Sequence, residues 1–534
     1  MEFMLVSSLQ KVFNDQRPQP WADSHMSVLN NQRGAFQLAF YSAKPSCFTL
    51  SLKGLDTFSV YRVEDVPSSY PCHKEVDEKY LRTGPGLYPD LLKPADPSLP
   101  FSASGSQWQA LWISFENLKP GLHTVSLCLT WEEQKEDLSL TVFVSDLQLP
   151  PQRLYHTEWF HGDCLADYYH VPVFSEEHWQ AVDGFLSAAH RCGVNMILTP
   201  VFTPPLDTMQ GGERTTVQLV DVFKENSSYS FDFRKLRRWI DLCRKNRIDE
   251  LEISHLFTQW GAVAAPKVLV YENGHPIKKF GWHTPAVGGE YTSFLRSFLT
   301  ELKKELTRQG MWEHTWFHIS DEPSEEQRSD YEAARNSIRD LLPDGRIIDA
   351  LSSFRFYSSG CVEKPVVCED HIEPFREAGV PELWTYYCTA QGLQVPNRFF
   401  SMPSGRNRIL GTLLYIYDLQ GFLHWGFNFY NTQFSLQSID PFTVTDAGGK
   451  FPSGDPFLVY PAPDRTAWPS IRSEVLYDGL QDLRLLHLAE EKLGRSAVLD
   501  LIEKTAGYRM SFTNYPIDET FFQALQKNIL EHLT

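Results

Sequence analysis

Residues Trp316-Phe317-His318-Ile319-Ser320-Asp321-Glu322-Pro323 form an apolar, aromatic stretch that ends in two adjacent carboxylates and a proline. Bulky residues of this kind favour a buried β-strand. Burial matters for carboxylates because desolvation and mutual repulsion split their pKa values. The stretch therefore predicts a barrel strand whose end carries catalytic acids, although Asp and Pro are also common in ordinary solvated turns.

The Asp-Glu dipeptide by itself is not specific, because the chain contains four: Asp77-Glu78, Asp249-Glu250, Asp321-Glu322 and Asp518-Glu519. The first two lie in charged or polar stretches. The last follows a proline and precedes an apolar-periodic run, which predicts a helix start. The pair at 321–322 alone follows a buried-strand pattern, so it is the strongest catalytic candidate.

Composition limits the class of protein. A chain of 534 residues is too long for one ordinary core and predicts two or three domains. Hydrophobic residues at 42% and charged residues at 22% are typical of a globular protein. The net charge of −18 argues against nucleic acid or an anionic membrane as the partner, because both require a basic surface.

Targeting and metal signals are weak throughout the chain. The first residues lack the pattern of a signal peptide, and no run approaches the roughly 20 apolar residues of a membrane helix. The nine cysteines are scattered, and Cys361 and Cys368 are too far apart for a zinc signature. We therefore expect a reduced, cytoplasmic setting, with no metal and no cofactor. The oligomeric state stays unknown.

The first 150 residues predict a β-sandwich. Short alternating runs at 48–52, 124–129 and 138–144 are separated by polar turns, one of them marked by Pro120-Gly121. Such a domain more often supports a neighbouring domain than binds a ligand itself.

From about Leu154 the pattern changes to strands that alternate with helices, which predicts a parallel (β/α)₈ barrel over residues 151–465. The expected strands are 154–160, 194–200, 251–256, 315–320, 346–350, 382–387 and 421–430. The expected helices are 176–192, 233–246 and 291–310. Residues 466–534 form a helical tail with 3.6-residue periodicity at 478–493 and 521–533.

Polar and aromatic residues follow several of these strands, where a barrel places its active site. Asp163 follows the first strand, Trp384 and Tyr387 lie at a later one, and Trp425 and Asn428 lie late in the last. Acids, amides and aromatic rings at one barrel mouth favour a carbohydrate site. The alternatives are a helix cap for Asp163 and core packing for the aromatic rings. The nucleotide-binding, zinc-protease and serine-hydrolase motifs are missing.

The segments 159–169, 318–323, 421–425 and 470–482 resemble glycoside hydrolase family 123 and, more broadly, the domain of unknown function 4091. Residues 83–92 resemble the N-terminal sandwich of that family. The resemblance spans nearly the whole chain and implies a β-sandwich, a barrel and C-terminal helices. It also implies a β-N-acetylgalactosaminidase that retains anomeric configuration through an oxazoline formed by the substrate's own acetamido group.

Carried onto this sequence, the resemblance makes Glu322 the general acid/base and Asp321 the residue that holds the acetamido N–H. Softer assignments give Trp384 and Trp425 a stacking role and Tyr387 a hydrogen bond to the acetamido carbonyl. Asp163 and Asn428 are predicted to form hydrogen bonds with sugar hydroxyls. His318 is predicted to tune the acidity of Glu322 or to pack against it.

The expected substrate is an oligosaccharide or glycoconjugate that ends in a β-linked N-acetylhexosamine, with no nucleic-acid or membrane partner. Two alternatives stay open. One is a retaining glycosidase with a covalent carboxylate nucleophile that acts on sugars without an acetamide. The other is a catalytically silent carbohydrate-binding protein. Characterised relatives are often exported, whereas this chain shows no export signal, so a cytoplasmic enzyme would act on imported glycans.

Overall fold

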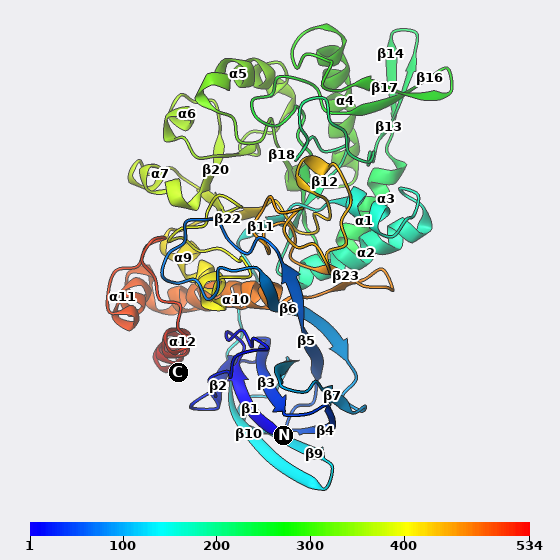
Figure 1. Ribbon diagram of the computed structural model, residues 1–534. Helices are drawn as coiled ribbons and strands as arrows, with labels where there is room; N and C mark the ends of the chain where they lie inside the picture. The colour runs from blue at the N-terminus through cyan, green and yellow to red at the C-terminus, as the bar shows by residue number, and fades with distance from the viewer. Residues whose placement is uncertain (534) are drawn as a thin grey trace.

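The computed structural model describes residues 1–533. Two five-stranded, mainly antiparallel sheets form the N-terminal part of the chain (Figure 1). The first contains β1 (Glu2–Ser7), β3 (Gly34–Ser42), β8 (Gln107–Phe115), β5 (Phe58–Ser68) and β6 (Gly86–Ala95). The second contains β2 (His25–Leu29), β10 (Gln134–Ser145), β9 (Gly121–Trp131), β4 (Ser46–Lys53) and β7 (Phe101–Ala103).

The two sheets share one apolar core, because each strand turns alternate side chains inward. In β9, Val125, Leu127 and Leu129 are buried while their neighbours are more exposed. They join Phe36 and Leu38 of β3 in a single hydrophobic cluster. The alternating runs expected at 48–52, 124–129 and 138–144 fall within β4, β9 and β10.

An eight-stranded parallel sheet follows and closes almost completely into a barrel. Its strands, in spatial order, are β18 (Thr315–Phe317), β15 (Glu250–Ile253), β12 (Met196–Thr199), β11 (Tyr155–Glu158), β22 (Gly421–His424), β21 (Trp384–Tyr386), β20 (Lys364–Cys368) and β19 (Ile348–Leu351). A single bridge between Phe317 and Ile347 joins the two outer strands, with Phe317 N donating to Arg346 O at 2.9 Å.

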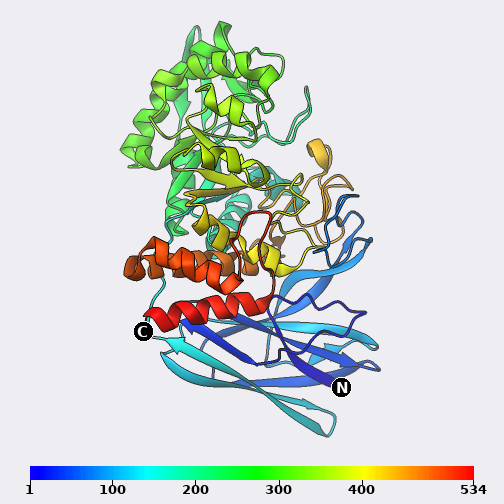
Figure 2. The same ribbon diagram turned by 90° about the vertical axis from the view of Figure 1, so that its left-hand side faces the viewer.

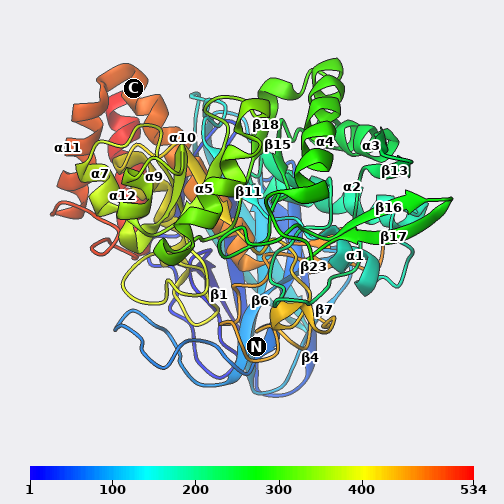
Figure 3. The same cartoon turned by 90° about the horizontal axis from the view of Figure 1, so that it is seen from above.

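Helices surround these strands, as the view from above shows (Figure 3). They are α1 (Gly162–Tyr168), α2 (Glu176–Arg191), α3 (Arg234–Lys245), α4 (Gly289–Arg308), α5 (Arg328–Asn336), α6 (Phe354–Ser358), α7 (Glu373–Glu377), α8 (Ser404–Arg408) and α9 (Leu410–Ile416). A small separate sheet of β13 (Asp221–Glu225), β14 (Ser228–Asp232), β16 (Val268–Glu272) and β17 (His275–Phe280) extends from two of the loops.

The helical tail consists of α10 (Ile471–Leu493), α11 (Arg495–Ala506) and α12 (Glu519–Leu533), with α12 against the sandwich beside β2 (Figure 2). Ser470 caps α10, and Arg472 forms a double hydrogen bond with Asp90 of β6, both at 2.8 Å. This buried ion pair links the tail to the sandwich. None of the described helices is long and apolar enough to cross a membrane.

Two expectations for the barrel were wrong in detail. The eighth strand, β20, was not predicted, because five residues interrupted by Pro365 give little periodic signal. The last strand ends at His424 rather than at residue 430. A Cβ at Gly426 would lie 2.6 Å from the backbone oxygens of Asp455 and Pro456, so the chain bends there beside another segment. Trp425 and Asn428 therefore lie on a loop beyond the strand.

Candidate active site

A cavity of about 160 Å³ opens at the carboxyl ends of the barrel strands. Asp321 and Glu322 line it, and so do Trp159, Tyr386 and Trp425 from other strand ends. The cavity is small beside the roughly 300–1,000 Å³ of sites for drug-sized ligands, which suits a single ring. A larger cavity of about 470 Å³ contains the Asp518-Glu519 dipeptide, but it lies beside the start of α12.

The backbone at Asp321 and Glu322 leaves the barrel ladder and turns sharply. The strand ends at Phe317, and Glu322 has a φ of 42°, a left-handed conformation that non-glycine residues rarely adopt. Trp260 N donates to Asp321 O at 2.8 Å and holds the turn. Because the ladder has ended, both adjacent carboxylates reach the cavity, whereas a regular strand would point them to opposite faces.

The two carboxyl groups have coupled acid–base equilibria. Burial, followed by repulsion from Glu322, raises the pKa of Asp321 well above its usual range. Burial also raises the pKa of Glu322, although its hydrogen bond from Tyr386 acts in the opposite direction. Glu322 as a whole residue is exposed, whereas its carboxyl group lies among protein atoms, and this local burial raises its pKa. The pair therefore retains a proton above the pH at which free carboxyl groups lose theirs.

Tyr386, the last residue of β21, donates its hydroxyl hydrogen bond to Glu322 Oε1 at 2.5 Å. Side chains alternate along this strand, so Trp384 and Tyr386 face the barrel interior while Tyr387 faces outward. Tyr387 was predicted to hydrogen-bond the acetamido carbonyl, but its neighbour Tyr386 is the tyrosine that lines the cavity and contacts Glu322. Strict alternation from the inward-facing Trp384 would have identified Tyr386.

His318 lies in a buried polar network behind the pair. Its Nε2 lies 2.6 Å from Glu252 Oε1, and its Nδ1 lies 3.2 Å from Asp349 Oδ1. Burial alone would lower the pKa of His318, but hydrogen bonds to the two carboxylates raise it to about 9. Its positive charge acts on Asp321 and favours the ionised carboxylate there. His318 does not line the cavity, so it affects the site through its charge.

The same network contains a group of metal-ligand type: His255, His318 and Asp349. The two imidazole rings stack with centroids 4.2 Å apart and planes inclined by 19°. The lone pair of an imidazole nitrogen points outward in the plane of its ring. In two stacked, nearly parallel rings these lone pairs point along parallel lines and do not converge on one ion. This geometry does not suit a metal centre, and the expected absence of a metal stays a prediction.

Trp425 forms part of the cavity wall as a fixed aromatic ring. Its Nε1 donates to Asp455 Oδ2 at 3.0 Å, and its ring packs edge-on against Phe429 and Phe451. Because one hydrogen bond and two ring contacts hold the Trp425 ring in place, the ring offers a rigid surface to a sugar. The predicted stacking role of Trp425 is compatible with this position.

Asp163 and Asn428 are engaged in structural contacts. Asp163 forms a double hydrogen bond with Arg214, at 2.8 and 2.9 Å, and both side chains are buried. The Asn428 side chain pairs with the backbone N–H and C=O of His161. Neither residue lines the cavity, so their predicted contacts with sugar hydroxyls find no support in this geometry.

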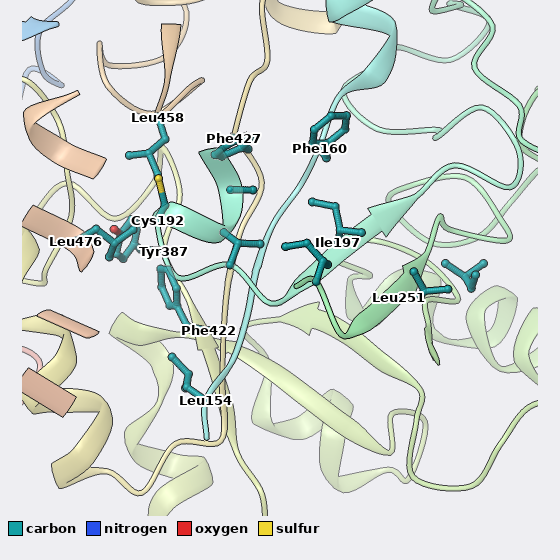
Figure 4. Packing of buried hydrophobic residues seen from close by; sticks show 14 of the residues in the cluster. Leu154, Phe160, Cys192, Ile197, Leu251, Tyr387, Phe422, Phe427, Leu458 and Leu476 are labelled. Carbon is teal, nitrogen blue, oxygen red and sulfur yellow. The ribbon is translucent and has the colours of Figure 1, made fainter. Parts of the chain in front are cut away.

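Trp384 and Tyr387 are also buried away from the cavity. Trp384 stacks on Tyr155, with planes inclined by 9°, near the amino ends of the strands. A Cβ on Gly421 would lie 1.9 Å from the Trp384 ring, so the ring fills this end of the barrel. Tyr387 packs against Phe422 on the outer side of the strands (Figure 4). Both positions favour the core-packing alternative.

The cavity residues that were not predicted include three with polar or aromatic side chains from neighbouring loops: Asp207, Gln259 and Trp260. They lie on loops after β12 and β15 without regular structure, and their sequence carries no periodic signal. The Gln259 side chain ties these loops together, accepting from Asp207 N and donating to Thr208 O, both at 2.8 Å.

Comparison with solved structures supports the overall fold. A structure of a family 123 glycoside hydrolase from Clostridium perfringens, described as a study of glycolipid glycan hydrolysis, superposes with a TM-score of 0.75. It is 15% identical, and the match covers 99% of this chain and 98% of that one. A putative β-galactosidase from Bacteroides fragilis reaches a TM-score of only 0.31 at 11% identity, covering 91% of this chain and 61% of its own.

No curated protein sequence matches the chain. The sequence profile of the glycoside hydrolase 123 catalytic domain matches residues 159–489, which extend from the end of the first barrel strand, β11, through the other seven barrel strands to near the end of α10. The chain therefore belongs to glycoside hydrolase family 123.

Proposed function

We propose that the protein is a retaining exo-β-N-acetylgalactosaminidase in which the substrate's acetamido oxygen is the nucleophile. The observation that carries this proposal is the adjacency of Asp321 and Glu322 in one small cavity. A covalent retaining mechanism places two carboxyl groups about 5–5.5 Å apart on opposite sides of the sugar. Asp321 and Glu322 are instead consecutive residues that line the same cavity. This arrangement favours one of them as the general acid and the other as a group that orients the substrate.

Glu322 is the proposed general acid/base. Burial raises its pKa and so favours the protonated carboxyl, which can donate to the leaving oxygen and then, once ionised, accept a proton from water. Tyr386, at 2.5 Å, holds one carboxyl oxygen in a fixed orientation. This constraint places the acidic proton relative to the scissile bond.

Asp321 is the proposed orienter of the acetamido group. Its pKa is raised mainly by burial and also by repulsion from Glu322. A bound acetamido N–H would donate to the carboxylate and favour its ionised form, as the charge of His318 already does. The shared proton would then stay on Glu322. The ionised Asp321 would stabilise the positive charge that develops as the oxazoline forms.

The substrate class follows from the same reasoning. The cavity is closed by the barrel below and suits one terminal ring, so we propose an exo action on an oligosaccharide or glycoconjugate. The galacto configuration rests on the family resemblance. We also propose a cytoplasmic setting, which the nine unpaired cysteines among the described residues suit.

One observation keeps the covalent alternative in view. Asp207 is a third carboxyl group at the cavity, and burial raises its pKa to about 6. Its Oδ2 is buried without a hydrogen-bond partner. If Asp207 were the covalent nucleophile, Asp207→Asn would abolish turnover of every substrate.

The test is hydrolysis of aryl β-glycosides of N-acetylgalactosamine, N-acetylglucosamine and galactose. We expect turnover of the acetamido sugars, fastest for the galacto epimer, and inhibition by an acetamido thiazoline. Turnover of the β-galactoside alone would favour the covalent mechanism, and no turnover would favour a silent binding protein. Glu322→Gln should slow substrates with poor leaving groups most, while Glu326→Gln, an exposed control nearby, should not.

A further inference from the structure

A thiol, a carboxylate and an imidazole lie together at the carboxyl end of β20. Cys368 is the last residue of that strand, and the one-turn helix η4 (Glu369–His371) follows it directly. The turn brings Asp370 and His371 next to Cys368, so that one ligand-type atom from each side chain lies within 4.8 Å of the other two. Three different metal-ligand groups therefore meet at one strand end.

The spacing of these three atoms is close to the spacing of ligands around a zinc ion. Zinc holds sulfur at about 2.3 Å and nitrogen or oxygen at about 2.0–2.2 Å in a tetrahedron, which separates the ligands by roughly 3.3–3.8 Å. Asp370 and His371 are exposed, so small rotations of their side chains can close the remaining gap. Because the three residues belong to one short turn, binding an ion requires little reordering of the chain.

The ligand types select the class of ion. A thiolate and an imidazole favour zinc and similar cations, whereas magnesium and calcium prefer oxygen ligands. Ionised Cys368 and Asp370 together carry two negative charges, which balance one divalent cation. Cys368 is buried and the other two ligands are exposed, so an ion can enter from solvent and a water molecule can supply the fourth ligand.

Asp370 is oriented but has no permanent cationic partner. Within residues 1–533 its ion-pair partner is His371, at 2.8 Å, and no lysine or arginine pairs with it. Gln391 Nε2 donates to its two carboxylate oxygens, at 3.3 and 3.2 Å. A hydrogen bond of this kind commonly orients a metal-binding carboxylate from behind. The carboxylate is therefore held in place and free to accept an ion.

The same glutamine connects the cluster to the catalytic cavity. Gln391 Oε1 accepts from Cys388 N at 3.0 Å and from Cys388 Sγ at 3.2 Å, and Cys388 lines the cavity. Cys368 also pairs with Tyr386 in the ladder between β20 and β21. Tyr386 donates the hydrogen bond to Glu322. An ion bound by Cys368 therefore lies one strand away from the residue that orients the proposed general acid.

We infer that Cys368, Asp370 and His371 bind a divalent cation of the zinc class, and that the bound ion inhibits the enzyme. As the ion binds, the Cys368 thiol releases its proton to water and the thiolate sulfur forms the bond to the metal. The ion brings two positive charges and the lost proton removes one, so the cluster gains one positive charge.

This added charge explains the inhibition. Positive charge near Glu322 favours its ionised form, which cannot donate a proton to the leaving oxygen. The ion is an inhibitor and not a cofactor, so the proposed chemistry still requires no metal. The inhibition rests on the proposed function, whereas the binding of the ion does not.

Binding is measured on the reduced protein after treatment with a chelator and removal of that chelator. Calorimetric titration with Zn²⁺ should show one strong site, and Co²⁺ should produce a thiolate-to-cobalt charge-transfer band. His371→Asn, at an exposed position, should weaken Zn²⁺ binding at least about tenfold, since even loss of an outer partner of a ligand costs about 10–100-fold. Cys368→Ser should also abolish the cobalt band.

Cys47→Ser and His275→Asn are the matched controls, because both positions are exposed and lie outside the cluster. Both variants should bind Zn²⁺ and Co²⁺ like the unaltered protein. If the His371 and Cys368 variants kept the full Zn²⁺ affinity and the cobalt band, the site would be overturned.

Inhibition is measured as kcat/KM for an aryl β-glycoside of N-acetylgalactosamine, with each variant compared to its own rate in a chelator. Zn²⁺ should lower the value for the unaltered protein at the concentrations at which it binds, and Mg²⁺ should not. His371→Asn should require at least about ten times more Zn²⁺ for the same loss.

The outcomes separate the site, the inhibition and the proposed function. Zn²⁺ binding without loss of activity would overturn the inhibition alone, and so would equal inhibition of the unaltered protein and His371→Asn. Zn²⁺ binding by a protein that hydrolyses no glycoside would overturn the proposed function and the inhibition, while the metal site would stand.

Discussion

The Tyr386 hydroxyl donates a hydrogen bond of 2.5 Å to Glu322, and this bond lowers the pKa of a carboxyl group that burial raises. Tyr386→Phe removes the donor, so the pKa of Glu322 should rise further. The alkaline limb of the pH dependence of kcat/KM, which reports loss of the acidic proton, should move to higher pH. The maximal rate should fall about tenfold, because a hydrogen bond to a charged group contributes about 1.5–3 kcal/mol.

Tyr387→Phe is the matched control for this variant. The Tyr387 hydroxyl is buried without a hydrogen-bond partner, and its ring packs outside the barrel. Both the rate and the pH profile should stay unchanged. If Tyr387→Phe moved the alkaline limb and Tyr386→Phe did not, the assignment of strand faces would be wrong.

Asp321→Asn tests the orienting role. The amide cannot provide the negative charge that stabilises the developing oxazolinium, so kcat for acetamido substrates should fall by about 10²–10³. Affinity for an acetamido thiazoline should fall in parallel, because that inhibitor resembles the cyclic intermediate. Azide should not restore the rate, since a small nucleophile replaces a lost covalent carboxylate. Rescue by azide with inverted product would support Asp321 as the nucleophile instead.

The sequence was most informative where local pattern and burial coincide. The stretch 316–323 predicted a strand end with two carboxyl groups that line the cavity, because an apolar run that stops at charged residues is a local signal. Asp249-Glu250 shows the limit of that signal, since Glu250 begins a barrel strand and binds Trp316 and Arg346 at the opposite end. A carboxylate near a strand lies at the active-site end only if the strand ends there, and the sequence does not give the exact first and last residues of a strand.

The less predictable part of the site lies on loops. Trp260 and Asp207 reach the cavity through contacts between segments that are about fifty residues apart, and nothing in either segment alone predicts that meeting. The same limit explains Asp163. Its pairing with Arg214 is a tertiary contact, and without that partner an acid after a strand resembles a ligand-binding residue.

His318 should make stability depend on pH in the alkaline range. Its pKa is about 9 in the folded protein and about 6.5 in an unfolded chain. A raised pKa contributes stability that is complete below pH 6.5 and is lost as the pH rises through 9. The contribution is up to about 3 kcal/mol, from 1.4 kcal/mol per unit.

The measurement is Tm between pH 6 and 10 for the unaltered protein and for His318→Gln. The variant should be less stable at pH 6.5, because Glu252 and Asp349 lose a cationic partner. The difference in Tm should narrow toward pH 10. A constant difference would show that the imidazole is neutral in the folded state and that its role is packing.

Asp163→Asn separates a structural ion pair from a sugar contact. The substitution leaves the Arg214 guanidinium, whose side chain is only 1% exposed, without its carboxylate. Breaking a buried pair from one side costs about 3–5 kcal/mol, so the denaturant midpoint should fall. KM of the folded enzyme should stay within about twofold, because Asp163 does not line the cavity. Asp167→Asn, on the same helix and half-buried, is the control and should leave stability nearly unchanged. A large rise in KM with little loss of stability would instead place the Asp163 carboxylate against the substrate, which would require the Arg214 pair to open during binding.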